Sequence, residues 1–199
     1  MRPAAGLAAE TPAPQAAGTQ SADVQPNGAQ AKAEVARAEK YLNTIDTLRS
    51  RFVQVTSRGG YSEGLVILHR PGQVRFDYDA PNPALLVANG LQLLYYDREL
   101  EQATYLPLWE TPLWFLLREH ISLTDKVEVL AVEREPGMLR LRLRERNASD
   151  RGTLELQFAD NPLQLYRWEV TDAQGVTTRV ALVDPQFGVP VTDDLFEVS

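Results

Sequence analysis

A serine stands between two glycines in the segment Gly60-Tyr61-Ser62-Glu63-Gly64, which matches the G-x-S-x-G pattern around the nucleophile of serine hydrolases. That pattern needs a strand, a sharp turn and then a helix, so that the hydroxyl stands exposed beside a histidine base. Here the following residues, Leu65-Val66-Ile67-Leu68, predict a strand. His69 and His120 are the only candidate bases, and neither is clearly paired with an acidic residue. We therefore expect a Gly-rich hairpin turn and no enzymatic activity.

The sequence gives no more indication of a metal or cofactor site than of a hydrolase site. The chain has no cysteine and 2 histidines, which do not make a closed ligand set. Asp77 and Asp79 lie near a predicted strand end and Asp193-Asp194 in a terminal turn, where solvated carboxylates are common. No Gly-rich phosphate loop is present. The sequence predicts neither a metal nor a cofactor.

Arg140, Arg142, Arg144 and Arg146 stand at every second position and so line one face of a predicted strand. Glu155 and Gln157 on the next strand are expected opposite them, which favours a solvated cross-strand ladder over docking to an acidic protein patch. The whole chain has 20 Lys and Arg against 27 Asp and Glu, a net charge of −7. Nucleic-acid-binding domains normally show the opposite balance, so we expect no nucleic-acid partner.

The 199 residues are enough for one domain with a tail. Residues 1–33 are rich in Ala, Pro and Gln and contain few large aliphatic side chains, which predicts a disordered tail. No apolar segment of signal-peptide type is visible in it. Residues 34–199 are expected to form the single domain. Because no apolar run approaches the roughly 20 residues of a membrane-spanning helix, we expect no stable membrane insertion.

Two segments have helical character. From Glu34 to about Arg51, apolar residues recur at spacings of three and four, which predicts an amphipathic helix. Thr111-Pro112 is typical of a helix start, and we expect a short, very apolar helix from there to His120. The segment from Tyr105 onward carries much apolar surface for a loop and a short helix. It either plugs a filled core or acts as a movable lid over an apolar cavity.

The remaining pattern is that of strands. From Phe52 onward the apolar period is two, with turn residues such as Asn89-Gly90 between the runs. About eleven strands with hairpin-length links follow, the last near Leu195-Phe196-Glu197-Val198, and this predicts an antiparallel meander. A sheet this long must curl or split. We therefore expect a mainly β protein with two or more helices: a strongly curved antiparallel sheet, or unclosed β-barrel, with a helical lid over an apolar cavity.

An ordered set of short segments in the chain resembles the outer-membrane lipoprotein carrier protein family, LolA. The resemblance covers roughly residues 34–199 and is densest from 52 to 120. Its core is the run from Gly64 to Tyr78. The segments are Phe52-Val53-Gln54, Gly64 to Tyr78 (with Arg70-Pro71-Gly72 and Arg75-Phe76-Asp77-Tyr78), Ala80-Pro81, Leu86-Val87-Ala88-Asn89-Gly90, Leu94-Tyr95-Tyr96-Asp97, Glu101-Gln102 and Thr111-Pro112-Leu113.

The resemblance implies a periplasmic, monomeric carrier without chemistry of its own. Members of the family take acylated lipoproteins from an inner-membrane ATP-driven releasing complex to an outer-membrane receptor, and hold the acyl chains in an apolar concavity. Arg70 corresponds to the family's arginine that keeps the lid closed through hydrogen bonds to its backbone. The tryptophan common before that arginine is replaced here by aliphatic residues. Besides Arg70, the expected acyl-chain contacts are Val66, Leu68, Phe76, Leu86, Leu94, Tyr96, Trp109, Trp114, Phe115 and Leu117.

Other functions remain open at this stage. The same fold could serve an outer-membrane lipoprotein acceptor, although an acceptor normally carries a lipidated cysteine. It could also serve a periplasmic lipid or lipoprotein sensor, although a sensor of that kind usually has a second domain. A hydrolase that uses Ser62 and a structural β-domain with a filled core complete the alternatives.

Overall fold

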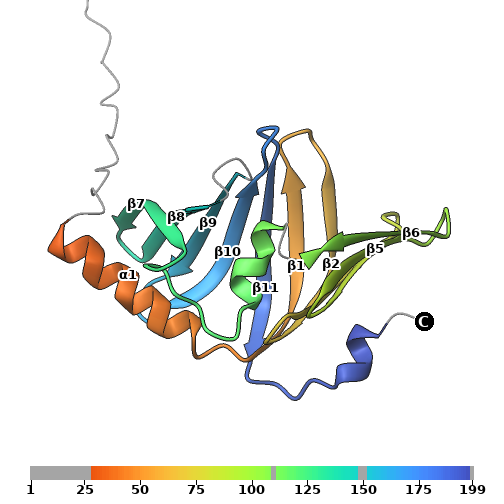
Figure 1. Ribbon diagram of the computed structural model, residues 1–199, viewed down its shortest axis with the longest axis horizontal. Coiled ribbons are helices and arrows are strands. Elements are labelled where there is room, and N and C mark those ends of the chain that lie inside the picture. Colours follow the sequence, from red (N-terminus) through yellow and green to blue (C-terminus); the bar gives the residue numbers. More distant parts are fainter. Residues whose placement is uncertain (1–27, 109–110, 148–151, 198–199) are drawn as a thin grey trace, which may run out of the picture.

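One antiparallel sheet of eleven strands curves around the only α-helix found in the described residues (Figure 1). The computed structural model describes residues 28–108, 111–147 and 152–197. The strands are β1 (Thr47–Thr56), β2 (Tyr61–His69), β3 (Gln73–Tyr78), β4 (Ala84–Asn89), β5 (Gln92–Asp97), β6 (Gln102–Pro107), β7 (Val127–Glu135), β8 (Met138–Glu145), β9 (Thr153–Ala159), β10 (Gln164–Thr171) and β11 (Thr177–Phe187). The helix α1 spans Ala29–Leu42, and two 3-10 helices, η2 and η4, span Pro112–Leu117 and Asp193–Phe196.

The strand order is β6-β5-β4-β3-β2-β1-β11-β10-β9-β8-β7. Two meanders, β1 to β6 and β7 to β11, therefore meet where the first and last strands pair. The outer strands β6 and β7 each pair on one side only, so the sheet does not close into a barrel. The predicted hairpin at Asn89-Gly90 is confirmed, with Gly90 at φ +99° and the Asn89 side chain accepting hydrogen bonds from the turn's backbone.

The first helix differs in its bounds from the prediction of Glu34 to about Arg51. It begins at Ala29, because the Ala-rich residues before Glu34 are good helix formers. It ends at Leu42, and Thr47 onward already belongs to β1, where alternate side chains turn inward. The spacing that resembled a continuing helical stripe is therefore that of a strand. The predicted disordered tail, residues 1–33, is therefore wrong for residues 29–33, which are helical; residues 1–27 lie outside the described residues, so there it stays a prediction.

The other expected helix and the last expected strand are also corrected. The segment after Thr111 forms a 3-10 helix, in which the Trp114 N–H donates to the Thr111 carbonyl oxygen at 3.1 Å. It is too short for a stable α-helix, and aromatic residues lose rotamer freedom in one. The expectation of two or more helices with a helical lid is therefore wrong, since the described residues contain one α-helix. The predicted strand at 195–198 is wrong as well, because Asp193–Phe196 is helical.

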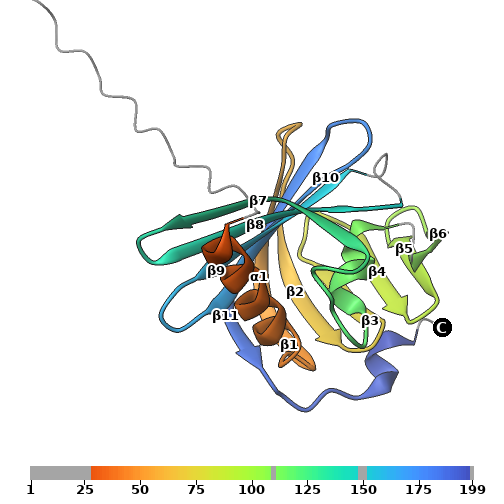
Figure 2. The ribbon, with the colours of Figure 1, turned by 60° about the vertical axis from the view of Figure 1, so that its left-hand side comes forward.

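The main core lies on the concave face of the sheet, between the strands and α1 (Figure 2). The ring of Phe52 meets those of Phe76 and Tyr78 edge-on, with centroids 5.3 and 5.2 Å apart. The apolar stripe of α1 and two buried leucines of η2 pack onto this face, and together they cover it. The apolar α1 residues in this core are Ala31, Val35, Ala38 and Leu42.

Charged side chains hold the first half of α1 to the edge of the sheet. Arg37 donates to Glu34 at 2.9 Å and to Asp160, in the β9–β10 turn, at 2.7 Å. Arg134 of β7 reaches the same two carboxylates, at 2.6 and 3.4 Å. Because Glu34 is buried, the network compensates the cost of removing its charge from water. This end of the helix is therefore held by ion pairs.

Candidate functional site

Arg70 lies at the end of β2 and connects the three segments that meet there. Its side chain is buried, with the residue 8% exposed. Nε donates to the Ile45 carbonyl oxygen at 2.5 Å and Nη2 to the Leu42 carbonyl oxygen at 2.6 Å. Nη1 reaches the carbonyl oxygen of Arg118, just after η2, at 3.4 Å. A guanidinium presents five N–H donors, so one side chain joins α1 and η2 to the sheet.

The acceptors suit a buried cation. The carbonyl of Leu42 belongs to the last turn of α1, where carbonyl groups lack helical partners and the helix dipole is negative. Burial lowers the pKa of the Arg70 guanidinium, and the nearby Asp46 carboxylate opposes that shift. Arginine still stays protonated at any physiological pH. Backbone carbonyl dipoles thus compensate the charge of Arg70. If the end of α1 moves away, Arg70 loses these contacts.

A second connection ties α1 to the chain after η2. Asn43 donates from Nδ2 to the Ile121 carbonyl oxygen at 2.8 Å, and its Oδ1 accepts from the Ile121 N–H at 2.9 Å. The Leu123 N–H donates to the Glu39 carboxylate at 2.6 Å. We refer to α1 and residues 111–123 together as the cover. Sequence reasoning missed Asn43, because an asparagine after a helix is an ordinary stop signal that does not reveal a distant partner.

A small apolar cavity lies between the cover and the concave face of the sheet. Its volume is about 30 Å³. A cavity needs roughly 10–15 Å³ to hold one water molecule, so this one has room for about two and is far too small for an acyl chain. Side chains therefore fill the interior in this conformation. The lining residues are Leu42, Ile45, Leu48, Val66, Leu68, Arg70, Val74, Phe76, Leu116, Ile121, Leu165 and Trp168.

The structure brings most of the predicted contact residues to the concave side. Four of them line the small cavity, namely Arg70, Val66, Leu68 and Phe76. Four more contribute to the same core, with Leu117 buried and Leu86, Trp114 and Phe115 packed against it. Trp109 lies outside the described residues. Sequence reasoning missed Trp168 of β10, which contacts Phe76 with ring centroids 6.4 Å apart; the alternation of that strand was the available signal.

Leu94 and Tyr96 were assigned to the wrong face. They pair with Val87 and Leu85, whose side chains lie on the convex face beneath Phe196 of η4. The run from Leu93 to Tyr96 is apolar at every position, so its pattern could not indicate which residues point inward. These two residues are therefore not part of the candidate site.

The geometry also contradicts the hydrolase alternative. Ser62 lies within β2, and its Oγ accepts a hydrogen bond from Asn82 Nδ2 at 2.9 Å. His69 is at the other end of the same strand, roughly 23 Å away at about 3.3 Å per residue. Within residues 28–108, 111–147 and 152–197, no cluster of three or more potential metal ligands occurs. No helix in that part of the chain is long and apolar enough to cross a membrane.

The arginines of β8 form the cross-strand ladder that the sequence predicts. Arg142 contacts Glu155 at 3.0 Å, and Arg140 contacts both Glu155 and Glu133, at 3.2 and 2.5 Å. Arg144 pairs with Glu128 at 2.7 Å. Each of these charges is neutralised by a neighbour on the same sheet. The ladder therefore stabilises the sheet surface and presents no excess positive charge to a partner.

These features define a class: an open, curved antiparallel sheet with one α-helix packed on its apolar concave face and a buried arginine beside the end of that helix. The chain belongs to the LolA family, since the family model described as outer membrane lipoprotein carrier protein LolA matches residues 43–199. An outer-membrane lipoprotein carrier protein from Methylococcus capsulatus is 28% identical over 172 residues, which cover 82% of each chain.

Further comparisons agree. A carrier protein of the same name from Pseudomonas aeruginosa is 42% identical over 77 residues, which cover 36% of this chain and 37% of the relative. This chain thus matches little more than a third of the length of that relative. A crystal structure of a DUF1329 family protein from Desulfovibrio piger aligns with a TM-score of 0.51 at 13% identity, over 84% of this chain and 96% of that chain. That likeness concerns the fold alone.

Proposed function

We propose that this protein is a periplasmic carrier that shelters the acyl chains of lipoproteins between the curved sheet and the cover. It accepts them from an inner-membrane ATP-driven releasing complex and passes them to an outer-membrane receptor. The names of its relatives support the proposal that the cargo is a lipoprotein. The observation that carries the proposal is the position of Arg70, whose three hydrogen bonds join α1 and η2 across an apolar cavity.

The small size of the cavity makes movement of the cover essential to this role. Since about 30 Å³ does not admit a hydrocarbon chain, an acyl chain needs a conformation in which the cover lies further from the sheet. Loading must move the end of α1 and residues 111–123 outward. The Arg70 hydrogen bonds then break, and the apolar walls around Val66 and Phe76 become available to the acyl chains.

Energetics favours such a closed state in a carrier. Burial of one long acyl chain stabilises a complex by on the order of 10 kcal/mol, at about 0.8 kcal/mol per methylene. A carrier with all of that affinity would not release its cargo. If opening the cover costs a few kcal/mol, only a small fraction of the protein is open. The apparent affinity for the acyl chain is then the affinity of the open form multiplied by that fraction. The polar contacts of Arg70 and Asn43 contribute that cost.

A release and handover assay tests the proposal. Membrane vesicles that contain the releasing complex and an acylated lipoprotein are incubated with ATP and the purified protein, and the lipoprotein is then measured in the soluble fraction and after addition of the receptor. We expect release with the acylated lipoprotein and none with a non-acylated one. Arg70→Leu should impair loading or handover, whereas Arg51→Leu, which removes an exposed arginine paired with Asp79, should not. Absence of release by the unmodified protein would refute the carrier role.

A further inference from the structure

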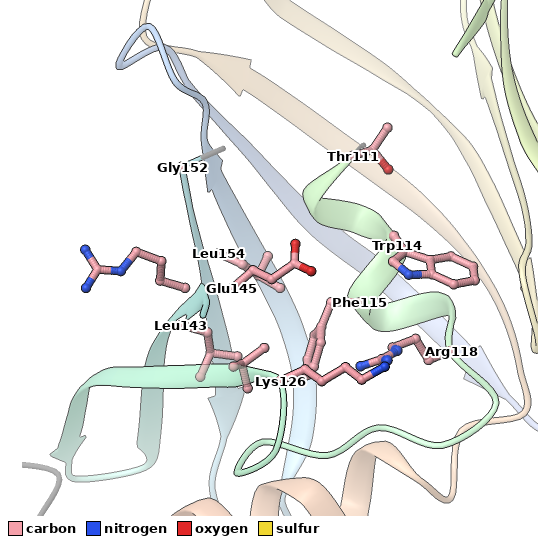
Figure 3. Close-up of a pocket in the computed structure, with 11 residues that line it drawn as sticks. Thr111, Trp114, Phe115, Arg118, Lys126, Leu143, Glu145, Gly152 and Leu154 are labelled. Atoms are coloured by element: carbon pink, nitrogen blue, oxygen red, sulfur yellow. The ribbon is translucent and has the colours of Figure 1, made fainter. Parts of the chain in front are cut away.

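A second pocket lies beside η2, between that helix and the ends of β8 and β9 (Figure 3). Its volume is about 170 Å³, which makes it larger than the cavity at Arg70. Its apolar wall consists of Trp114 and Phe115 from η2 and of Val127, Leu143 and Leu154 from the strands. The pocket therefore offers apolar sides and a volume several times that of one water molecule.

Two cationic side chains converge on this pocket from different segments. Arg118 follows η2 and Lys126 precedes β7, and Figure 3 shows their charged ends pointing toward each other below Phe115. Within the described part of the chain, neither side chain has an ion-pair partner. The β8 arginines, by contrast, all contact carboxylates. Two like charges at one pocket repel each other when neither has a counter-charge of its own, and an anion bound near both removes that repulsion.

The other charged groups of the pocket do not neutralise this pair. Arg144 is paired with Glu128 at 2.7 Å. Glu145 has an interaction of its own, and its carboxylate points toward the Thr111 side of the pocket in Figure 3. Arg118 and Lys126 therefore add positive charge to a pocket of mixed polar and apolar lining, on a protein whose net charge is −7.

We propose that this pocket binds an amphiphile with an anionic oxygen head group, held between Arg118 and Lys126, with its alkyl chain along Trp114, Phe115 and Leu154. A guanidinium binds carboxylate or phosphate oxygens in a bidentate manner, and an ammonium adds a second charge. A cavity needs roughly 10–15 Å³ to hold one water molecule, so the pocket has room for part of an alkyl chain. The pocket is lined by other residues than the Arg70 cavity, but it lies under the same cover, so the inference extends the proposed carrier role to a head-group site.

Calorimetric titrations below the micelle concentration test this site. The probes are dodecyl phosphate, dodecanoate, inorganic phosphate and uncharged dodecyl maltoside. We expect measurable binding of the two anionic amphiphiles, and at least tenfold weaker binding of inorganic phosphate and of dodecyl maltoside. The relative affinities of dodecyl phosphate and dodecanoate then distinguish a phospholipid-type from a fatty-acid-type head group.

Charge variants locate the binding. Arg118→Gln combined with Lys126→Gln should weaken dodecyl phosphate at least tenfold, while Arg58→Gln, which removes an exposed cation in the β1–β2 turn, should change it less than twofold. Circular dichroism checks that each variant is folded. The proposal is overturned if the double variant binds as tightly as the unmodified protein, or if neither anionic amphiphile binds. It is also overturned if dodecyl maltoside or inorganic phosphate binds as tightly as dodecyl phosphate.

Discussion

The guanidinium of Arg70 lies 2.6 Å from the carbonyl oxygen of Leu42, the last residue of α1. Among the described residues that line the apolar cavity, Arg70 is the only cation, and this contact places it against the negative end of the helix that covers the cavity. The helix end and the arginine therefore stabilise each other only in the closed arrangement. The predictions below follow from this arrangement and from the packing around it.

Replacement of Arg70 by leucine should lower the free energy of unfolding by about 1–3 kcal/mol. The lost hydrogen bonds are charge-assisted, and the Leu42 and Ile45 carbonyl groups lose a donor, although removal of a buried charge offsets part of the cost. Urea unfolding followed by circular dichroism measures the change. The control, Arg51→Leu, should unfold within experimental error of the unmodified protein, and an equal loss in both variants would contradict the special position of Arg70.

Asn43 provides a test of the second connection. Asn43→Ala removes both hydrogen bonds to Ile121 and should lower the free energy of unfolding by about 1–2 kcal/mol. Asn43→Asp keeps an acceptor for the Ile121 N–H but places a carboxylate against the Ile121 carbonyl oxygen, so it should be no more stable than Asn43→Ala. Thermal unfolding of the three proteins compares them. If Asn43→Asp behaves like the unmodified protein, the donor half of the pair is unimportant.

Loading should loosen the cover while leaving the sheet intact. When a triacylated peptide binds, hydrogen exchange at the Gly72, Ile121 and Leu123 amides should accelerate. The Gly72 amide bonds to residues 111–123, and the other two bond from that segment to α1 or to Asn43 beside it, so they exchange faster if the two parts of the cover move apart. Amides in the middle of β1, such as Val53, should exchange as before. Deuterium uptake measured by mass spectrometry with and without the peptide decides this point. Unchanged exchange at the Gly72, Ile121 and Leu123 amides would mean that the cover does not open.

Gly64 should be intolerant of any side chain. A Cβ at this position in β2 would lie 2.2 Å from the Asp77 carbonyl oxygen and 2.7 Å from Phe52 Cε1, and the backbone of β3 cannot easily move away. Gly64→Ala should therefore lower the free energy of unfolding by about 3 kcal/mol or more. At Gly60 the nearest atom, at 2.8 Å, is Thr56 Oγ1, which can rotate away. Gly60→Ala should consequently be much less destabilising in the same denaturant titration.

The ion pairs of α1 should make the free energy of unfolding depend on pH. The hydrogen bond from Arg37 lowers the pKa of Asp160 below its ordinary value in the folded state. A carboxyl group whose pKa falls on folding stabilises the protein at pH values above about 4, and that contribution disappears as the pH falls toward the folded pKa. Asp160→Asn should therefore be less stable than the unmodified protein at pH 6, and the difference should vanish near pH 2. A constant difference across denaturation curves from pH 6 to pH 2 would contradict this assignment.

Local patterns in the sequence were sufficient to predict the sheet. Period-two alternation and turn residues such as Asn89-Gly90 act between neighbours in the chain, so an antiparallel meander follows from them. The apolar spacing around Leu48 led to a helix that was predicted too long, because over a few residues a strand and a helical stripe give similar patterns. The length of α1 and the 3-10 form of η2 depend on contacts made only after the sheet has curved.

The candidate site was predictable in part. Arg70 was found through resemblance, since an arginine before a proline does not by itself indicate three distant carbonyl acceptors. Val66 and Phe76 follow from strand alternation, whereas Leu94 and Tyr96 were misplaced because their strand is apolar on both faces. Asn43 and Trp168 were missed because their partners are far away in the chain. The small volume of the cavity is a property of packing that the sequence does not reveal.

The pairing of β1 with β11 has a consequence for how the chain reaches its native state. Each meander can form from contacts between successive hairpins, but the joint between them brings Leu48 opposite Phe187. Contacts of such long sequence separation slow folding, because the entropy of closing the loop must be overcome first. The centre of the sheet is therefore the last part that a growing polypeptide can complete, and the two arms remain unjoined until the final strand has emerged.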